Sequence, residues 1–178
     1  MTLCDFGHPA ASKEPDMEFL SYSILVGCGA TALVDVWALL RKRLFDMPLP
    51  DFGLLGRWLG LMPRGKFRHE SIAAAPPVRG ERWIGWIAHY LIGISFAALL
   101  LAVWGLEWMR APRLGPALIV GVATVVAPYF IMQPAMGAGI AASRTPRPAE
   151  ARLHSFLTHA VFGVALYLAG WIVSRVVG

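Results

Sequence analysis

The sequence predicts an all-α fold, an integral membrane bundle of four helices. Three observations predict it. Of the 178 residues, 57% are hydrophobic and 15% are charged, whereas soluble domains have about 45–50% apolar and about 25% charged residues. The hydrophobic residues gather in four stretches that are each long enough to cross a bilayer. The basic residues gather between these stretches, where membrane proteins carry them. The same composition excludes intrinsic disorder and, with 2 cysteines, a disulfide scaffold.

The predicted spans, in chain order, are 19–44, 83–106, 114–134 and 154–177. Each reaches the ~20 residues that a helix needs to cross ~30 Å of hydrocarbon, and a helix satisfies its own backbone hydrogen bonds. Residues 1–18 carry several charges and lack the basic-then-apolar order of a cleavable signal peptide. We therefore expect a flexible extension over 1–18 and a single domain over 19–178.

The positions of the 16 Lys and Arg residues predict the orientation. Two connections hold or flank most of them: Arg41, Lys42, Arg43, Arg57, Arg64, Lys66, Arg68, Arg79 and Arg82 belong to the first, and Arg144, Arg147 and Arg152 to the second. By the positive-inside rule both connections are cytoplasmic, so both termini and the 1–18 extension face outward. Because these bases flank membrane spans, nucleic acid is not an expected partner.

The first connection is long enough to hold structure of its own. Five apolar residues of its 48–70 segment fall on one face of a helix: Leu54, Leu55, Trp58, Leu61 and Met62. This pattern predicts a helix that lies flat in the cytoplasmic interface, with Trp58 at headgroup depth. The alternative is that Gly53, Gly56 and Gly60 break the helix into a loop folded under the bundle, since glycine costs a helix ~1 kcal/mol.

The second and fourth spans match each other at an offset of 70 residues. His89 then corresponds to His159, and Gly93 to Gly163. The first and third spans match more weakly, with Thr31 against Thr124. These matches predict a tandem repeat of two helices, in which two parallel halves are related by an axis along the membrane normal. Chance similarity between apolar helices is the alternative.

Three ionisable residues lie within the spans, namely Asp35, His89 and His159. Counted from the cytoplasmic helix ends at ~1.5 Å per residue, all three have a similar depth. Ionisable groups inside a span cost ~3 kcal/mol or more and normally face the bundle interior. We therefore predict a polar layer near the cytoplasmic face, with Gln133 at its mouth.

Small residues and a proline accompany this layer. Gly93 and Gly163 share a helix face with the histidines, and together with Gly27 they are predicted helix-packing positions. Pro128 stands where the third span matches Asp35, and a proline inside a span frees a backbone carbonyl that can add to the layer.

The polar layer admits four interpretations. It forms a proton relay or ion path, a divalent-metal site made by His89, His159 and Asp35, or a pair of axial ligands for haem b. In the fourth interpretation Asp35 bonds one histidine and the remaining imidazole bonds a hydroxyl or carbonyl, which only fixes the helix register. No cofactor is the simplest expectation. No nucleophile elbow or pair of catalytic carboxylates is present, so the sequence does not predict an enzyme.

Four runs of the sequence carry a family resemblance: Gly29-Ala-Thr-Ala-Leu-Val-Asp35-Val-Trp-Ala, Gly56-Arg-Trp-Leu-Gly60, Pro63-Arg-Gly-Lys-Phe-Arg-His-Glu-Ser-Ile72 and Met132-Gln-Pro-Ala-Met-Gly-Ala-Gly-Ile-Ala-Ala-Ser-Arg-Thr-Pro146. They resemble the bacterial inner-membrane proteins catalogued as domain-of-unknown-function family 2938, over residues 19–177. The resemblance implies four spans and the bacterial cytoplasmic membrane. It implies no substrate, cofactor or catalytic residue. The runs include the loop candidates Arg64, Arg68, His69 and Arg144.

Taken together, these observations predict an inner-membrane protein that binds or transports a small solute or ion through the His and Asp layer. One alternative is a non-catalytic accessory or assembly subunit of a membrane complex, and another is a haem or metal redox module. The expected partners are the lipid bilayer and either a second copy of the chain or another membrane subunit.

Overall fold

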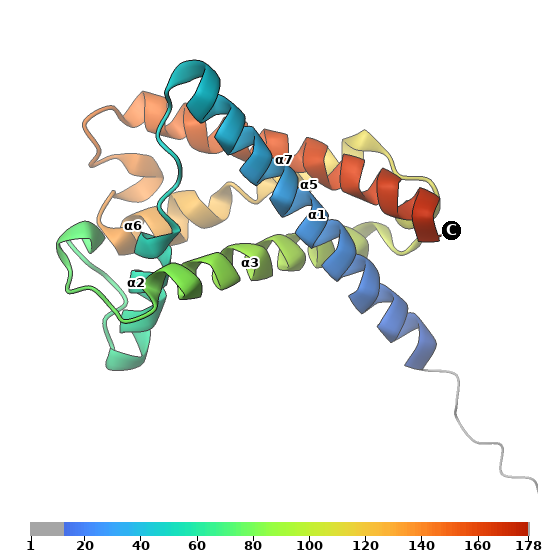
Figure 1. The fold of residues 1–178 in the computed structure, drawn as a ribbon, viewed down its shortest axis with the longest axis horizontal. Helices are drawn as coiled ribbons and strands as arrows, with labels where there is room; N and C mark the ends of the chain where they lie inside the picture. The colour runs from blue at the N-terminus through green and yellow to red at the C-terminus, as the bar shows by residue number, and fades with distance from the viewer. Residues whose placement is uncertain (1–12, 178) are drawn as a thin grey trace, which may run out of the picture.

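The computed structural model describes residues 13–177, which form helices and connecting loops without strands. Four long helical segments run through the molecule (Figure 1): α1 (Lys13–Phe45), α3 (Glu81–Trp104), the bent segment Leu114–Met136, and α7 (Pro148–Val177). All four are long and apolar enough to cross a membrane. The predictions of an all-helical chain and of four candidate spans are confirmed.

Two helices begin earlier than the sequence predicts. Helix α1 begins at Lys13, inside the predicted extension, and the rest of that extension, residues 1–12, lies outside the described residues. Helix α7 begins at Pro148 instead of residue 154. Proline suits the first turn of a helix because its missing N–H has no helical partner there. Hydropathy alone detects the apolar part of such a helix and misses its polar first turns.

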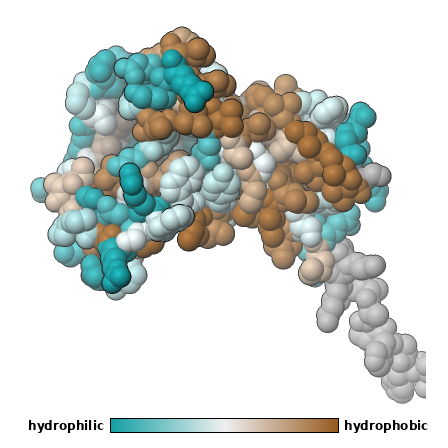
Figure 2. Space-filling view, in the orientation of Figure 1, coloured by the Kyte–Doolittle hydropathy of each residue, from teal (hydrophilic) through white to brown (hydrophobic). Residues whose placement is uncertain are grey.

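The long helices are apolar on both their inner and their outer faces. Val26, Leu100 and Leu166 are fully buried between helices, while Ile87 and Ile119 are exposed on the outside. Figure 2 shows hydrophobic surface over the middle of the bundle and hydrophilic surface toward its ends. A helix that is apolar all round is typical of a membrane span.

Glycines hold the helices together in two antiparallel pairs. In the first pair, a Cβ added to Gly27 of α1 would overlap the backbone of Ile94 in α3. In the second pair, a Cβ added to Gly121 would overlap the backbone of Gly163 in α7. Such close approach maximises van der Waals contact where no hydrophobic effect drives association. We call α1 with α3 the first hairpin, and Leu114–Met136 with α7 the second hairpin.

The third span is bent and changes its helical geometry at a proline. It consists of α5 (Leu114–Ala123), the π-helical turn η3 (Pro128–Met132) and α6 (Gln133–Met136). Pro128 cannot donate a hydrogen bond to the carbonyl of Thr124. That carbonyl instead accepts one from the N–H of Ala127, at 3.0 Å. The freed group is therefore satisfied locally within the bend.

The two long connections lie together at one end of the bundle (Figure 1). The N–H of His69 in the first connection donates to the carbonyl of Ala135, just before the second, at 2.8 Å. Their short elements are α2 (Phe52–Leu61), η1 (Met62–Arg64), η2 (Ile72–Ala74) and η4 (Ile140–Ala142). The connection at the other end contains α4 (Glu107–Arg110).

Helix α2 combines parts of both interpretations of the first connection. It is a helix, capped by the Asp51 carboxylate on the N–H of Gly53, and it packs against the start of α3. A Cβ on Gly56 would overlap the carbonyl of Glu81, and a Cβ on Gly85 would overlap the carbonyl of Phe52. The glycines therefore do not break the helix. They permit the backbone of α2 to come into contact with that of α3.

Trp58 corrects one prediction. We expected it at headgroup depth, but its side chain is only 8% exposed and its Nε1–H donates to the carbonyl of Phe67 at 2.9 Å. It lies in a second core with Leu55, Leu61, Ile72 and Ala135. The apolar face of α2 is covered by the loop that follows it and by the end of the third span. Helical periodicity reveals an apolar face without revealing what covers it.

Candidate functional site

The first hairpin brings together three polar side chains. Asp35 of α1 lies opposite His89 and Tyr90 of α3, with His89 Nε2 at 3.0 Å from Asp35 Oδ1 and the Tyr90 hydroxyl donating to Asp35 Oδ2 at 3.2 Å. The side chains of His89 and Asp35 are 20% and 21% exposed. The pair is therefore half-buried.

Aromatic rings enclose the imidazole of His89. The ring of Phe52, at the start of α2, stacks on it with centroids 4.0 Å apart and planes at 25°. Trp86, one turn before His89, meets the imidazole edge-on at 5.9 Å. Helix α2 is thus part of the site, because it covers one face of the histidine.

The donors and acceptors of this cluster define its chemistry. An ionised carboxylate only accepts hydrogen bonds, so with Asp35 ionised both the Tyr90 hydroxyl and the Nε2–H of His89 donate to it. Nδ1 of His89 is then the unprotonated nitrogen and is free to take up a proton. An imidazole held by a carboxylate in this way has a fixed tautomer and a fixed ring orientation, with its second nitrogen available as an acceptor.

His159 and Gln133 have partners of their own. The Thr124 hydroxyl donates to the carbonyl of Gly121 at 2.7 Å, so its oxygen accepts from Nδ1 of His159 at 2.9 Å. Gln133 donates to the hydroxyl of Ser155 at 3.2 Å. The structure therefore brings Asp35 and His89 together and gives His159 a hydroxyl partner, which is the pairing that the register interpretation predicts.

The candidate metal and haem ligands do not gather at one place. Over residues 16–177, whose side chains the structure describes, no three His, Cys, Asp or Glu side chains are close enough to hold a metal ion. His89 and His159 belong to different hairpins, since α3 packs mainly on α1 and α2, and α7 on α1 and α5. One nitrogen of each imidazole is already hydrogen-bonded to the protein. This geometry favours neither a divalent-metal site nor a haem held by both histidines.

A cleft opens beside the cluster of the first hairpin. It has a volume of about 520 Å³ and is lined by Pro50, Asp51, Phe52, Gly53, Arg82, Trp83, Trp86 and Tyr90. Tyr90 belongs to both features, because it lines the cleft and its hydroxyl donates to Asp35. A molecule bound in the cleft beside Tyr90 would therefore be connected to the Asp35–His89 pair through the Tyr90 hydroxyl.

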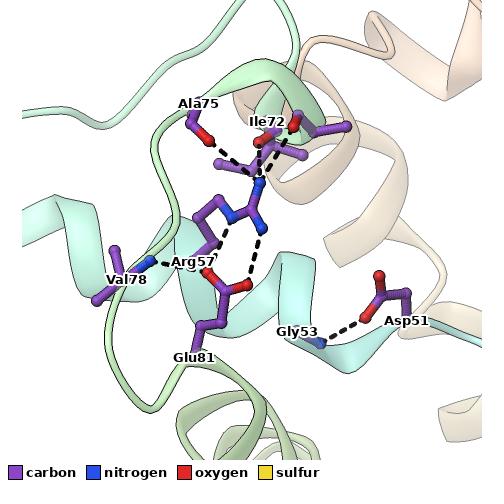
Figure 3. Close-up of polar contacts among 8 residues, drawn as sticks. Asp51, Gly53, Arg57, Ile72, Ala75, Val78 and Glu81 are labelled. Carbon is purple, nitrogen blue, oxygen red and sulfur yellow. Dashed lines mark hydrogen bonds and ion pairs between the residues drawn. The ribbon is translucent and has the colours of Figure 1, made fainter.

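An ion pair fastens α2 to the start of α3 (Figure 3). Nη2 and Nε of Arg57 donate to the two carboxylate oxygens of Glu81, at 2.7 and 2.9 Å. Nη1 donates to three loop carbonyls, those of Ile72, Ala73 and Ala75, at 3.4, 3.1 and 3.1 Å. The N–H of Val78 completes the arrangement with 2.9 Å to Glu81. The two charged side chains are only 15% and 19% exposed.

This ion pair is not predicted from the sequence, where Arg57 is one base among many and Glu81 has no distinguishing pattern. The hydrogen bonds that it donates to the Glu81 carboxylate raise the pKa of the Arg57 guanidinium above its usual value, so the arginine is charged at any physiological pH. The available signal was an arginine in a short glycine-flanked helix, and nothing in that pattern names a partner 24 residues away.

The four loop candidates do not form one site. The side chains of Arg64, Arg68 and Arg144 are exposed. His69 is half-buried, and its Nε2 is a buried atom without a hydrogen-bond partner among the described residues. His69 contributes instead through its backbone, which joins the first connection to the end of the third span.

Comparison with known proteins gives one match. The family model described as a protein of unknown function, DUF2938, matches residues 24–173. No curated protein and no solved structure matches the chain. The matched residues include all four candidate spans in large part and the whole polar cluster, and they confirm the resemblance drawn from the sequence. The chain belongs to the DUF2938 family.

Proposed function

We propose that this chain is a multi-pass protein of the bacterial inner membrane that binds a small solute at the α2 end of the bundle and couples that binding to a proton. The observation that supports it is the hydrogen-bonded chain from the cleft through Tyr90 to Asp35 and His89. Ionisable groups within membrane spans are costly and commonly mark substrate or proton pathways.

The coupling follows from what each state of His89 requires. Protonation of Nδ1 converts the imidazole to a cation that the Asp35 carboxylate stabilises. A charge change at this pair alters the hydrogen bond that Tyr90 donates to the same carboxylate, and Tyr90 lines the cleft. Binding in the cleft and proton uptake at His89 are therefore linked, and each changes the affinity for the other by the same factor.

The orientation is part of the proposal. The connections that carry most of the bases lie together at the α2 end, and the positive-inside rule assigns that end to the cytoplasm. The cleft would then open toward the cytoplasmic headgroup region. Trp83, which lines it, is 76% exposed, as suits a tryptophan of the interfacial aromatic belt.

The test is a pH titration of the histidines by NMR. We expect protein labelled with ¹⁵N-histidine, in phospholipid nanodiscs, to show one resonance that changes with pH as an imidazole does when it takes up a proton, and we expect this resonance to be missing in the His89→Gln variant. His159→Gln is the matched control and should leave that titration in place. If the resonance lost in His89→Gln does not titrate, the Asp35–His89 pair only fixes helix register and the proposal is wrong.

A further inference from the structure

The rim of the cleft carries one acidic and one basic side chain, placed on either side of Gly53. A Cβ added to Gly53 would lie 2.9 Å from Asp51 Oδ1 and 3.7 Å from Arg82 Cγ. Both side chains are exposed. They line the cleft of about 520 Å³ and also a neighbouring one of about 370 Å³. The acid and the base therefore face the same open space.

Neither charge is neutralised by an ion pair with another side chain of residues 16–177. Asp51 uses Oδ1 to cap α2, which leaves Oδ2 available. Arg82 makes no hydrogen bond or ion pair with the described residues. Its neighbour Glu81 differs, because both of its oxygens are bound by Arg57. The ion pair of Figure 3 thus keeps Glu81 from pairing with Arg82.

Aromatic rings form the rest of the lining. Phe52, Trp83, Trp86 and Tyr90 line the same cleft as the two charges. Aromatic faces attract ammonium groups, with tryptophan the strongest of them. An ammonium group beside Asp51 would therefore gain both a carboxylate and aromatic contacts, while a phosphate or carboxylate would pair with the Arg82 guanidinium.

We infer that the cleft binds a zwitterion that carries an ammonium group and a phosphate or carboxylate group, with the ammonium at Asp51 and the anion at Arg82. This inference rests on the proposed small-solute function and names its substrate class. The chemistry has two sources: a soluble zwitterion, or the phosphoethanolamine headgroup of a membrane lipid. Both fit a cleft that begins where α3 enters the apolar region of the bundle.

The experiment measures binding of phosphoethanolamine by calorimetry, with the full chain in phosphatidylglycerol nanodiscs. We expect binding at least tenfold tighter than that of ethanolamine or inorganic phosphate alone. Asp51→Asn and Arg82→Gln should each weaken it at least tenfold. Asparagine preserves the α2 cap, so a loss in that variant reports the charge. Arg79→Gln, a nearby exposed base outside both clefts, is the matched control and should bind as the wild type does.

A second arm separates the two sources. In nanodiscs that contain phosphatidylethanolamine, a lipid ligand should displace phosphoethanolamine, whereas a soluble ligand should bind unchanged. Equal binding of ethanolamine or phosphate alone, or no binding of any of these probes with no effect of the lipid, overturns the inference. The His89 titration in the same nanodiscs without probe distinguishes the failures: if it persists, only the substrate class is wrong, and if it is absent, the proposed function is wrong.

Discussion

The two hairpins of this molecule are built alike and differ in the partner of their histidine. Each packs two antiparallel helices through glycines, and each has a histidine one turn before a glycine, His89 before Gly93 and His159 before Gly163. In the first hairpin the histidine meets the Asp35 carboxylate. In the second it meets the Thr124 hydroxyl. The same local pattern thus places one histidine against a carboxylate and the other against a hydroxyl.

A one-turn difference in helix contact accounts for the two partners. In the proposed repeat, Thr124 corresponds to Thr31 and Pro128 to Asp35. Gly93 lies against the carbonyl of Gly27, whereas Gly163 lies against the carbonyl of Ala117. In that register Ala117 corresponds to Ile24, which is about one turn closer to the start of the helix than Gly27. His159 consequently meets the counterpart of Thr31. The second hairpin has a proline and a π-helical turn where the first has its carboxylate.

The hairpins also differ in what covers them. Helix α2 caps the first hairpin, where Phe52 stacks on His89 and the Arg57–Glu81 pair fastens the cap. The second hairpin has η4 in place of such a helix. Both hairpins have the same His-x-x-x-Gly spacing, so this spacing does not distinguish the two histidines. What makes His89 a candidate site is the set of elements that surround it.

The largest predicted effect comes from separating α2 from α3. We expect Gly85→Ala to lower the free energy of unfolding by about 2 kcal/mol, because its Cβ would overlap the backbone of Phe52, which cannot move without moving α2. Denaturation followed by circular dichroism in detergent measures this.

Gly115→Ala in the second hairpin is the control for that change. Its Cβ would meet nothing within 4 Å, so the variant should be as stable as the wild type or slightly more stable. Equal stability of the two alanine variants would show that the contact between α2 and α3 is not tight.

A smaller loss of stability is expected from removing the charge of Glu81, which holds α2 against α3 through Arg57. Glu81→Gln leaves the Arg57 guanidinium with a neutral partner in a place where it is only 15% exposed, so the midpoint of thermal unfolding should fall by several degrees. The matched change is Glu107→Gln, which removes the partner of Arg110 from a pair that is 78% and 75% exposed. The Glu107→Gln variant should have the same unfolding midpoint as the wild type. A comparable fall of the midpoint in both variants would contradict the special role of the Arg57–Glu81 pair.

The smallest effect compares the two histidine partners directly. Thr124→Val should cost about 1 kcal/mol of stability through the lost hydrogen bond and leave the His89 titration unchanged. Asp35→Asn removes the carboxylate that stabilises the imidazolium, so the pH-dependent change of the His89 ¹⁵N resonance should move to lower pH. If the titration responds to Thr124→Val and not to Asp35→Asn, the functional roles of the two hairpins are the reverse of those proposed here.

The sequence was sufficient for the features that repeat along one helix. Apolar length predicts the four candidate spans, and the His-x-x-x-Gly spacing puts Gly93 and Gly163 on the histidine faces. Depth arithmetic put Asp35, His89 and His159 at one level, but depth does not specify direction around a helix axis. It therefore did not separate the histidine that meets Asp35 from the one that meets Thr124.

Features that depend on distant parts of the chain could not be read in this way. The burial of Trp58 depends on Phe67 and on the end of the third span. The partner of Arg57 is 24 residues away. The glycines of α2 suggested a broken helix. A helix-propensity scale includes the entropic cost of glycine, but it does not include the close contact between α2 and α3 that glycine permits.

The hydrogen bond between the N–H of His69 and the carbonyl of Ala135 has a mechanical consequence. It ties the loop that follows α2 to the bent end of the third span, so α2 cannot lift away from α3 as an isolated flap. Any movement that widens the cleft pulls on the segment after the π-helical turn, where the helix is already irregular. The two hairpins are therefore joined at this end through their backbones, and we expect a displacement of α2 to displace the end of the third span as well.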